Sequence, residues 1–276
     1  MLICREQKEI FKCAESFLYF IENYWAVFNP HLKDDFEWYP WQLQQASKWD
    51  DKENNIRSVV LGDRRTGQTE LMLARMVWTL VFGDKISIGI MSPTFNSSSR
   101  FLKQIKSILE HIKEKWGLCY IKENNYQITL DNGNWLNIDS IKRDSLRGAG
   151  YTDIFIDQAG YNSKYGIWTD IMHSLLPTME YGLGNMYIST TGMLQGTDFK
   201  PWLKKNQEEW SIEYYSWQCV PNRDFKWYKE IKSNFGGSMY NDYGIGWLDY
   251  LTSDDTLDDI RYKEWLYPDE DGDTVF

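Results

Sequence analysis

One eight-residue stretch carries the residue types best suited to chemistry: Gly62-Asp63-Arg64-Arg65-Thr66-Gly67-Gln68-Thr69. It follows an apolar, β-branched run at 56–61 and precedes a helix-like apolar segment at 71–78. A strand, a glycine-bounded turn and a helix form the setting in which backbone N–H groups bind phosphate oxygens. The spacing matches the G-x-x-x-x-G-K-[ST] phosphate-binding pattern except that position 68 is Gln instead of Lys. Because the lysine is missing, a simple strand-to-helix turn explains this stretch equally well.

Polar residues also follow two other apolar strands. Asp157 and Gln158 end one, and Ser189-Thr190-Thr191 end another. Beside a phosphate-binding loop, the hydroxyl of Thr69 would coordinate Mg²⁺, and Asp157 would hold the same ion directly or through water. Each of these features also has an ordinary interpretation. The aspartate could be a turn or cap residue, and the run of hydroxyl residues could reflect only the preference of threonine for strands. Their occurrence in this order predicts a nucleotide site.

An aromatic segment upstream, Trp38-Tyr39-Pro40-Trp41-Gln42, offers an amide that could read an adenine edge. The alternative is that Pro40 simply opens a helix. We predict Gln42 as a nucleotide-binding residue.

The elements that must position these residues alternate between strand and helix. This alternation is typical of a parallel sheet that binds its ligand at the carboxyl ends of the strands. The fold class is therefore predicted as α/β, a P-loop NTPase with a mainly parallel central sheet flanked by helices, plus a small C-terminal lid or linker subdomain. The predicted strands are 56–61, 86–91, 118–122, 126–130, 134–139, 153–157 and 186–191, with a hairpin turn at Asp131-Asn132-Gly133; the predicted helices are 68–82, 97–116 and 166–176.

Three regions are expected along the chain. Residues 1–50 form a helical region that contains the adenine motif, and residues 51–192 form the ATPase core. Residues 193–276 form a small subdomain that ends in an acidic, turn-rich linker.

Composition restricts the class of protein. The net charge of −10 argues against a protein that coats nucleic acid unaided, although a local basic groove is compatible with it. The four cysteines lack C-x-x-C spacing, so neither a zinc site nor a disulfide framework is indicated. The longest apolar stretch, near 71–82, is too short for a membrane span, and the N-terminus lacks a signal peptide. We therefore expect a soluble intracellular chain.

In combination, these motifs resemble a known family, the ATPase portion of the large terminase subunit, which is the DNA-packaging motor of tailed bacteriophages. The resemblance runs along nearly the whole chain. It implies that residues 193–276 lead toward a nuclease domain, which this sequence does not contain. The similar segments are Phe11-Lys12-Cys13-Ala14 through 19–24, Tyr39-Pro40-Trp41-Gln42, Arg64-Arg65-Thr66-Gly67-Gln68-Thr69, Ser145-Leu146-Arg147-Gly148 leading into 153–159, Ser189-Thr190-Thr191-Gly192, and 262–265 with 272–276 at the junction to the nuclease domain.

The resemblance implies a role for each motif. Arg64 would be the cis arginine finger, with Arg65 as the substitute, while Thr69 and Asp157 would hold Mg²⁺. Gly62, Thr66, Gly67 and Gln68 would complete the ATP site, and Ser189, Thr190 and Thr191 would couple hydrolysis to subdomain motion. The implied partners are double-stranded DNA, a portal protein, a small terminase subunit and four further copies in a pentameric ring, with no membrane. The implied location is the cytoplasm of the bacterial host, and transiently the portal vertex of the procapsid.

Two positions depart from the family pattern. Gln68 replaces the loop lysine, and Gln158 replaces the glutamate that polarises the attacking water. Losing a preorganised charge or a base each costs on the order of 10²–10⁴ in rate, so hydrolysis is expected to be impaired. These glutamines fit either changes introduced into an active enzyme or a naturally degenerate ATPase. The alternative functions are a non-hydrolysing nucleotide-binding or structural subunit and a helicase-like DNA translocase.

Overall fold

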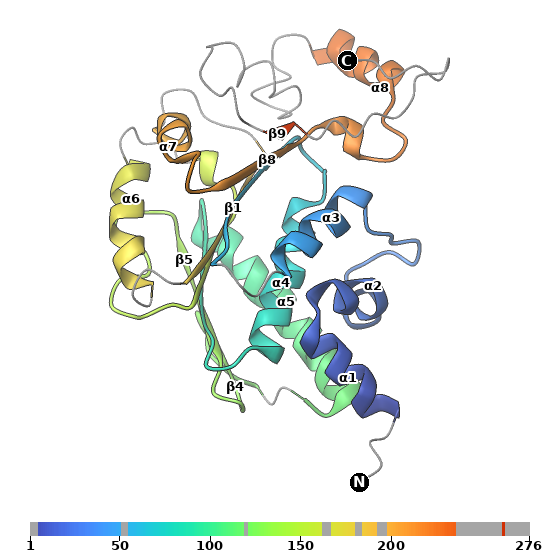
Figure 1. Ribbon diagram of the computed structural model, residues 1–276, viewed down its shortest axis with the longest axis vertical. Coiled ribbons are helices and arrows are strands. Elements are labelled where there is room, and N and C mark those ends of the chain that lie inside the picture. Colours follow the sequence, from blue (N-terminus) through green and yellow to red (C-terminus); the bar gives the residue numbers. More distant parts are fainter. Residues whose placement is uncertain are drawn as a thin grey trace.

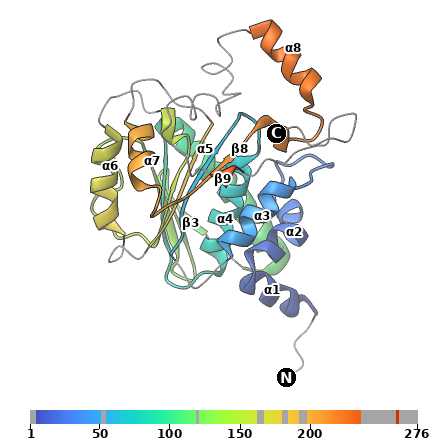
Figure 2. The same cartoon turned by 45° about the horizontal axis from the view of Figure 1, so that its top comes forward.

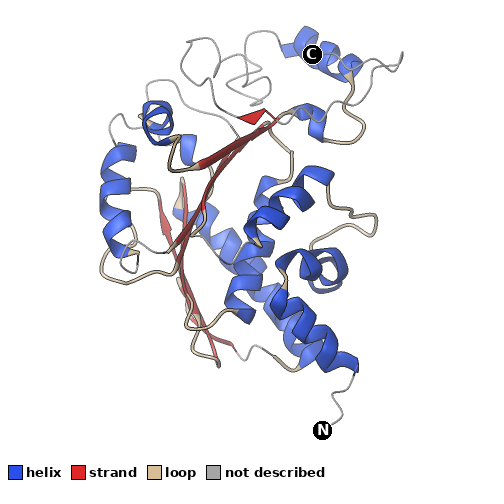
Figure 3. Cartoon of the chain, viewed as in Figure 1, coloured by secondary structure: helices blue, strands red, loops and turns tan. Residues whose placement is uncertain are grey.

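The computed structural model describes residues 5–50, 55–118, 121–161, 167–179, 184–191, 198–235 and 261–262. Within these residues, the strands form one nine-stranded sheet in the order β3-β4-β5-β2-β6-β7-β1-β8-β9 (Figure 3). The strands are β1 (Arg57–Gly62), β2 (Ser87–Ser92), β3 (Ile121–Glu123), β4 (Gln127–Leu130), β5 (Trp135–Ser140), β6 (Asp153–Ile156), β7 (Asn185–Thr190), β8 (Ser211–Tyr215) and β9 (Arg261–Tyr262).

The centre of this sheet confirms the predicted fold class. Strands β2, β6, β7 and β1 are neighbours and run parallel, so their carboxyl ends meet at one edge. The predicted hairpin is also present, because β4 and β5 pair antiparallel and Gly133 takes the positive φ of 88° that the turn requires. The predicted strands thus all belong to the sheet, with bounds shifted by up to three residues.

Helices cover both faces of the sheet (Figure 1). One face is packed against the first five helices, and the other against α6 and α7. The helices are α1 (Arg5–Glu15), α2 (Phe17–Phe28), α3 (Pro40–Trp49), α4 (Gln68–Phe82), α5 (Phe95–Trp116), α6 (Ile167–Leu175), α7 (Phe199–Asn206) and α8 (Phe225–Phe235), with short 3-10 turns η1 (Ala159–Tyr161), η2 (Leu176–Thr178) and η4 (Trp217–Cys219).

Successive residues of each central strand point to opposite faces of the sheet, and this explains why helices pack on both faces. In β1, Val60 packs with the first five helices, whereas Val59 and Leu61 face α6 and α7. In β6, Phe155 and Ile154 divide in the same way. Because successive strand residues point to opposite faces, these apolar runs are buried on both sides.

The N-terminal region is helical, as predicted, and its first two helices are separated at Ser16. The Ser16 side chain accepts a hydrogen bond from the Tyr19 N–H (3.1 Å) and donates one to Asp50 (2.6 Å). Asp50 also accepts the Phe17 N–H (2.8 Å). The N-cap therefore starts a second helix, α2, at a new angle.

The predicted boundary at residue 192 does not coincide with the end of the sheet. Strand β8 pairs in parallel with β1, from Ser58 opposite Ser211 to Gly62 opposite Tyr215. At the other boundary, α1, α2 and α3 share one hydrophobic core with α4 and α5, so residues 1–50 do not pack as a separate unit. Apart from β9, the predicted linker beyond residue 235 lies outside the described residues. None of the described helices combines the length and apolar character of a membrane span.

Candidate nucleotide-binding site

The predicted phosphate-binding loop, residues 62–69, lies between the end of β1 and the start of α4. Gly67 precedes α4 with a φ of 90°, in the left-handed region that favours glycine. Gly62 is packed so closely that an added Cβ would lie 2.7 Å from the Tyr215 carbonyl oxygen. Arg65 also has a positive φ, 63°, which is uncommon for a side chain of this size. The loop is therefore held in a conformation that only its surroundings can stabilise.

A buried carboxylate within the loop, that of Asp63, fixes the loop to neighbouring segments. Asp63 is completely buried, and its two oxygens accept hydrogen bonds from the Tyr214 hydroxyl and the Trp217 N–H, both at 2.8 Å. The Thr66 hydroxyl donates to the Asp63 carbonyl oxygen (2.8 Å), and the Trp41 indole donates to the Thr66 carbonyl oxygen (3.1 Å). These contacts join the loop to β8 and α3.

The amide of Gln42 is also bound to this loop. Its Nε2 donates to the Gly67 carbonyl oxygen (2.9 Å), and its Oε1 accepts the Tyr39 N–H (2.8 Å). Gln42 is 2% exposed and does not line the pocket described below. In this structure Gln42 supports the loop, and its reading of adenine stays a prediction.

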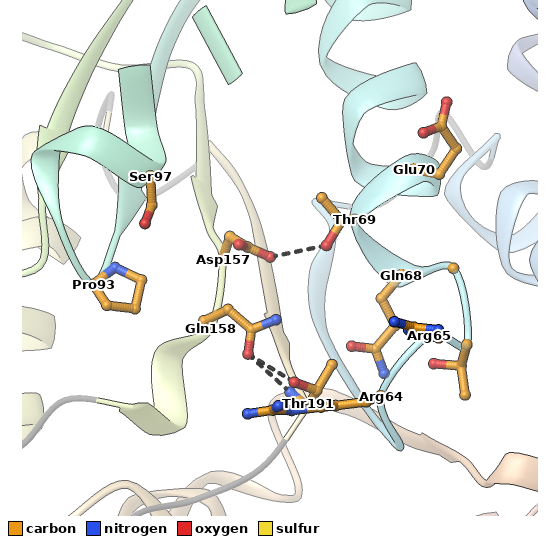
Figure 4. A pocket seen from close by; sticks show the side chains of 12 residues that line it. Arg64, Arg65, Gln68, Thr69, Glu70, Pro93, Ser97, Asp157, Gln158 and Thr191 are labelled. Atoms are coloured by element: carbon orange, nitrogen blue, oxygen red, sulfur yellow. Dashed lines mark hydrogen bonds between the residues drawn. The ribbon is translucent and has the colours of Figure 1, made fainter. Parts of the chain in front are cut away.

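A pocket of about 740 Å³ opens above the loop, between α4 and the carboxyl ends of the strands (Figure 4). Of the predicted site residues, Gln42, Gly62, Ser189 and Thr190 do not line it, and the others do. The lining residues are Arg64, Arg65, Thr66, Gly67, Gln68, Thr69, Glu70, Pro93, Ser97, Asp157, Gln158 and Thr191.

Thr69 and Asp157 meet in this pocket. The Thr69 hydroxyl lies 3.5 Å from Asp157 Oδ1, and the Ser189 hydroxyl donates to the same oxygen at 3.0 Å. Burial raises the pKa of Asp157 to about 6, against the opposite effect of the Ser189 and Thr69 hydrogen bonds. A buried carboxylate beside a hydroxyl is a donor set that suits Mg²⁺, which needs few protein ligands when it also binds phosphate. The predicted proximity of these two side chains is thus confirmed in geometry.

Gln68 occupies the position of the missing lysine. Its side chain lies within the turn of the loop, and the residue is only 3% exposed (Figure 4). Neither Oε1 nor Nε2 has a hydrogen-bond partner among the described residues. A buried amide without partners is costly. A phosphate oxygen accepting from Nε2 would remove part of that cost, so the site fits an anion.

Three consecutive residues at the end of β7 bind the segment that follows β6. Ser189 donates to Asp157, and the Thr190 hydroxyl accepts the Gly160 N–H (3.1 Å). The Thr191 hydroxyl donates to Gln158 Oε1 (2.9 Å). Two of the three residues predicted to couple hydrolysis to motion, Ser189 and Thr191, therefore contact the positions predicted for the metal and the water, Asp157 and Gln158.

Comparison with known proteins was made by sequence and by structure. No protein-family model matches the chain. A point mutant of the large terminase ATPase domain from Thermus phage P74-26 superposes with a TM-score of 0.60 at 15% identity, over 80% of this chain and 97% of that domain. The large terminase of bacteriophage HK97 gives 0.60 at 12% identity, over 80% of this chain. The large terminase of the thermophilic bacteriophage D6E, in complex with ATP-γ-S, gives 0.54 at 11% identity, over 74% of this chain.

The chain has the fold of the ATPase domain of phage large terminases. It spans about half the length of the HK97 and D6E large terminases, 47% and 51%.

Within this terminase ATPase fold, sequence reasoning missed several supporting residues. Glu70 lines the pocket, and its Oε1 accepts the Trp25 indole N–H and the Asn29 amide, both at 2.7 Å. Burial raises the pKa of Glu70, while these two hydrogen bonds lower it. Asp63 lay inside the recognised loop, but its partners are more than 150 positions away. No local signal in the sequence joins residues so far apart.

Proposed function

We propose that this chain is the ATPase domain of a phage large terminase, which hydrolyses ATP to drive double-stranded DNA into a procapsid. The observation that carries the proposal is the meeting of Thr69 and Asp157, 3.5 Å apart, beside a phosphate-binding loop on a terminase ATPase fold. The D6E protein, with the same fold, has been crystallised with ATP-γ-S and with ADP. That precedent supports a nucleotide as the ligand of the pocket.

The residues divide the work of binding. Backbone N–H groups of the loop and of the first turn of α4 would hold the phosphates, aided by the helix dipole. Thr69 and Asp157 would hold Mg²⁺, which when bound neutralises charge on the phosphate oxygens. Arg64 and Arg65 line the same pocket and are exposed, so they can approach a γ-phosphate.

The two glutamines determine how fast the reaction runs. Gln68 can donate a hydrogen bond to a phosphate but adds no positive charge. Gln158 can hold a water molecule but cannot take its proton at neutral pH. We propose that the chain binds nucleotide and turns it over slowly, since a missing base alone costs on the order of 10²–10⁴ in rate.

A second candidate is a nucleotide-binding subunit that does not hydrolyse ATP. It is favoured by the hydrogen bonds at Gln158, whose Oε1 accepts from both the Thr191 hydroxyl (2.9 Å) and the Thr191 N–H (3.3 Å). Because the Gln158 amide is hydrogen-bonded to Thr191, the residue that follows β7, it could pass the presence of a bound phosphate on to that strand. A helicase-like translocase is a third and weaker candidate, without an observation of its own.

The partners follow from the proposed role. The chain would act on double-stranded DNA with a portal protein and a small terminase subunit, as one of five copies in a ring. Its place would be the cytoplasm of the bacterial host, and transiently the portal vertex of the procapsid.

Nucleotide binding and metal dependence test the proposal together. We expect calorimetry to detect MgATP-γ-S binding by the chain, and Asp157→Asn and Thr69→Val to remove the dependence on Mg²⁺. Thr129→Val, in β4 and outside the pocket, is the matched control. Absence of binding both by the chain and by its Gln68→Lys variant would refute the proposed function. Phosphate release by the Gln68→Lys/Gln158→Glu variant then separates a slowed ATPase from a subunit that never hydrolyses ATP.

A further inference from the structure

The end of β8 and the segment that follows it are hydrogen-bonded to the predicted phosphate-binding loop. Asp63 accepts hydrogen bonds from Tyr214 and from the Trp217 N–H, as described above. One residue further along the loop, the main-chain carbonyl oxygen of Arg64 accepts a hydrogen bond from Arg223 Nη1 at 3.0 Å. Two adjacent loop residues are thus bound by a segment about 150 positions away.

Arg223 is held in place by its own neighbours. Its guanidinium lies 4.8 Å from the centre of the Trp227 ring, a cation–π contact. The side chain is partly buried, and this burial lowers its pKa, while the charge of Asp63 raises it. Arginine stays charged under such conditions, so the hydrogen bond to the Arg64 carbonyl is charge-assisted.

The same residues attach α8 to the rest of the protein. Trp217 stacks on Tyr228 with ring centres 5.0 Å apart and planes 9° apart, and it also contacts Trp227 at 5.8 Å. These rings and Ile231 form a small hydrophobic cluster, distinct from the two that flank the sheet. Beyond this cluster α8 projects away from the sheet (Figure 2).

We propose that Arg223 is a positioning residue of the nucleotide site, which joins the main chain at Arg64 to α8 so that the placement of α8 sets the loop. The inference rests on the proposed function of the pocket. It adds a second link between the loop and the C-terminal part of the chain, beside the hydrogen bonds that Asp63 accepts from Tyr214 and Trp217.

The loop has a physical need for such a contact. Arg64 and Arg65 both line the pocket, and the carbonyl of Arg64 lies in the peptide unit between them. Arg65 holds a left-handed backbone conformation, which is disfavoured without outside support. Releasing the Arg64 carbonyl would let this peptide rotate, which would change the direction in which the Arg64 and Arg65 side chains leave the main chain.

Hydrogen exchange and nucleotide binding test the role of Arg223 in the full chain. We expect Arg223→Met to speed amide exchange in residues 60–69 about 10-fold and to weaken MgATP-γ-S binding by a similar factor. Arg223→Lys keeps a charged donor and is expected to restore most of both. Trp227→Leu removes the ring beneath Arg223 without touching the loop, and an intermediate effect is expected. Lys226→Met, at the start of α8, is the control for loss of charge, and thermal unfolding confirms that each variant is folded.

Unchanged exchange in residues 60–69 of Arg223→Met would overturn the inference. An equal defect in Arg223→Lys and Arg223→Met would also overturn it, because a structural role of the stem would then explain the loss. If neither the parent chain nor any of the variants binds MgATP-γ-S, the proposed nucleotide function fails. The exchange measurement still decides whether Arg223 positions the loop in that case.

Discussion

Gln158 and Thr191 face each other across the ends of β6 and β7. Gln158 Oε1 accepts the Thr191 hydroxyl at 2.9 Å and the Thr191 N–H at 3.3 Å, which leaves Nε2 on the side of the pocket (Figure 4). A glutamate at 158 could accept the same two hydrogen bonds and still offer its second oxygen to a water molecule. The surroundings of Gln158 are therefore compatible with a catalytic base, and only the side chain itself lacks the chemistry.

Replacing Gln68 and Gln158 by the lysine and glutamate of the pattern that they resemble should separate binding from turnover. Gln68→Lys alone is expected to recover nucleotide affinity with little hydrolysis, because its lysine is a charge-assisted contact to bound phosphate. Gln158→Glu alone is expected to do little while the phosphates are poorly held. The double variant is expected to gain on the order of 10²–10⁴ in rate over Gln68→Lys, the usual contribution of a general base. Calorimetry and phosphate release measure the two effects, with Gln104→Lys in α5 as the matched charge control. Hydrolysis by the parent chain as fast as by the double variant would contradict these roles.

The Thr191 hydroxyl is expected to serve turnover more than affinity. In the Gln68→Lys/Gln158→Glu background, Thr191→Val removes one hydrogen bond to residue 158 and leaves the backbone contact. One such bond is worth about 1 kcal/mol, so kcat should fall by about 5- to 10-fold while the affinity for MgATP-γ-S is retained. Single-turnover phosphate release measures the change, and Thr129→Val in β4 is the matched control. A loss of affinity equal to the loss of kcat would show that Thr191 holds the ground state instead.

The N-terminal helices carry an acid-sensitive contact. Glu9 accepts hydrogen bonds from the Tyr19 hydroxyl (2.6 Å), Lys12 (2.9 Å) and the Tyr24 hydroxyl (3.1 Å). These partners, Tyr19 first, lower the pKa of Glu9 to about 2 from its ordinary value of 4.5. Because the folded-state pKa is the lower one, the stabilisation is complete above pH 4.5 and is lost as the pH falls from there toward 2.

Glu9→Gln should therefore reduce the pH dependence of stability within that window. We expect the urea midpoint of the parent to fall more between pH 5 and pH 3 than that of Glu9→Gln. Glu6→Gln, on the same helix, is the control and should follow the parent. Parallel loss in the parent and in Glu9→Gln would show that Glu9 gains nothing from its three partners.

The sequence predicted the sheet well because its signals are local. Each central strand contains Val or Ile among its apolar residues, and the hairpin carries Asn132-Gly133 at its turn. Strand β8 was not predicted as part of the sheet, because its sequence, Ser-Ile-Glu-Tyr-Tyr, places an acidic residue, Glu213, in the middle of the strand. Glu213 is buried because Lys48 and Tyr215 are its partners, and neither contact can be read from the strand alone.

Some residues of the candidate site were predicted from the sequence, and the residues that support its loop were not. Thr69 was found because it closes the recognised loop pattern at the start of α4, and Asp157 because it directly follows the apolar strand β6. Since β1 and β6 belong to the same parallel part of the sheet, the loop after β1 and the end of β6 lie at the same edge. The supports of the loop were not found, because Asp63, Arg64 and Gln42 have partners set by packing between distant segments. Gln42 was assigned to the site by its motif, and its contact with Gly67 depends on how α3 packs against α4.

Gln42 offers a last and direct test, since it either supports the loop or reads the base. Its amide is buried and spans the Gly67 carbonyl and the Tyr39 N–H. If support is its role, Gln42→Ala should weaken MgATP and magnesium tripolyphosphate alike, by about 1–3 kcal/mol, the cost of leaving buried polar groups unpaired. If adenine reading is its role, affinity for MgATP should fall while that for tripolyphosphate is unchanged. Competition calorimetry in the Gln68→Lys background compares the two ligands, and Gln104→Ala is the control. From the contacts in the structure we expect equal losses, and a loss confined to ATP would contradict the supporting role.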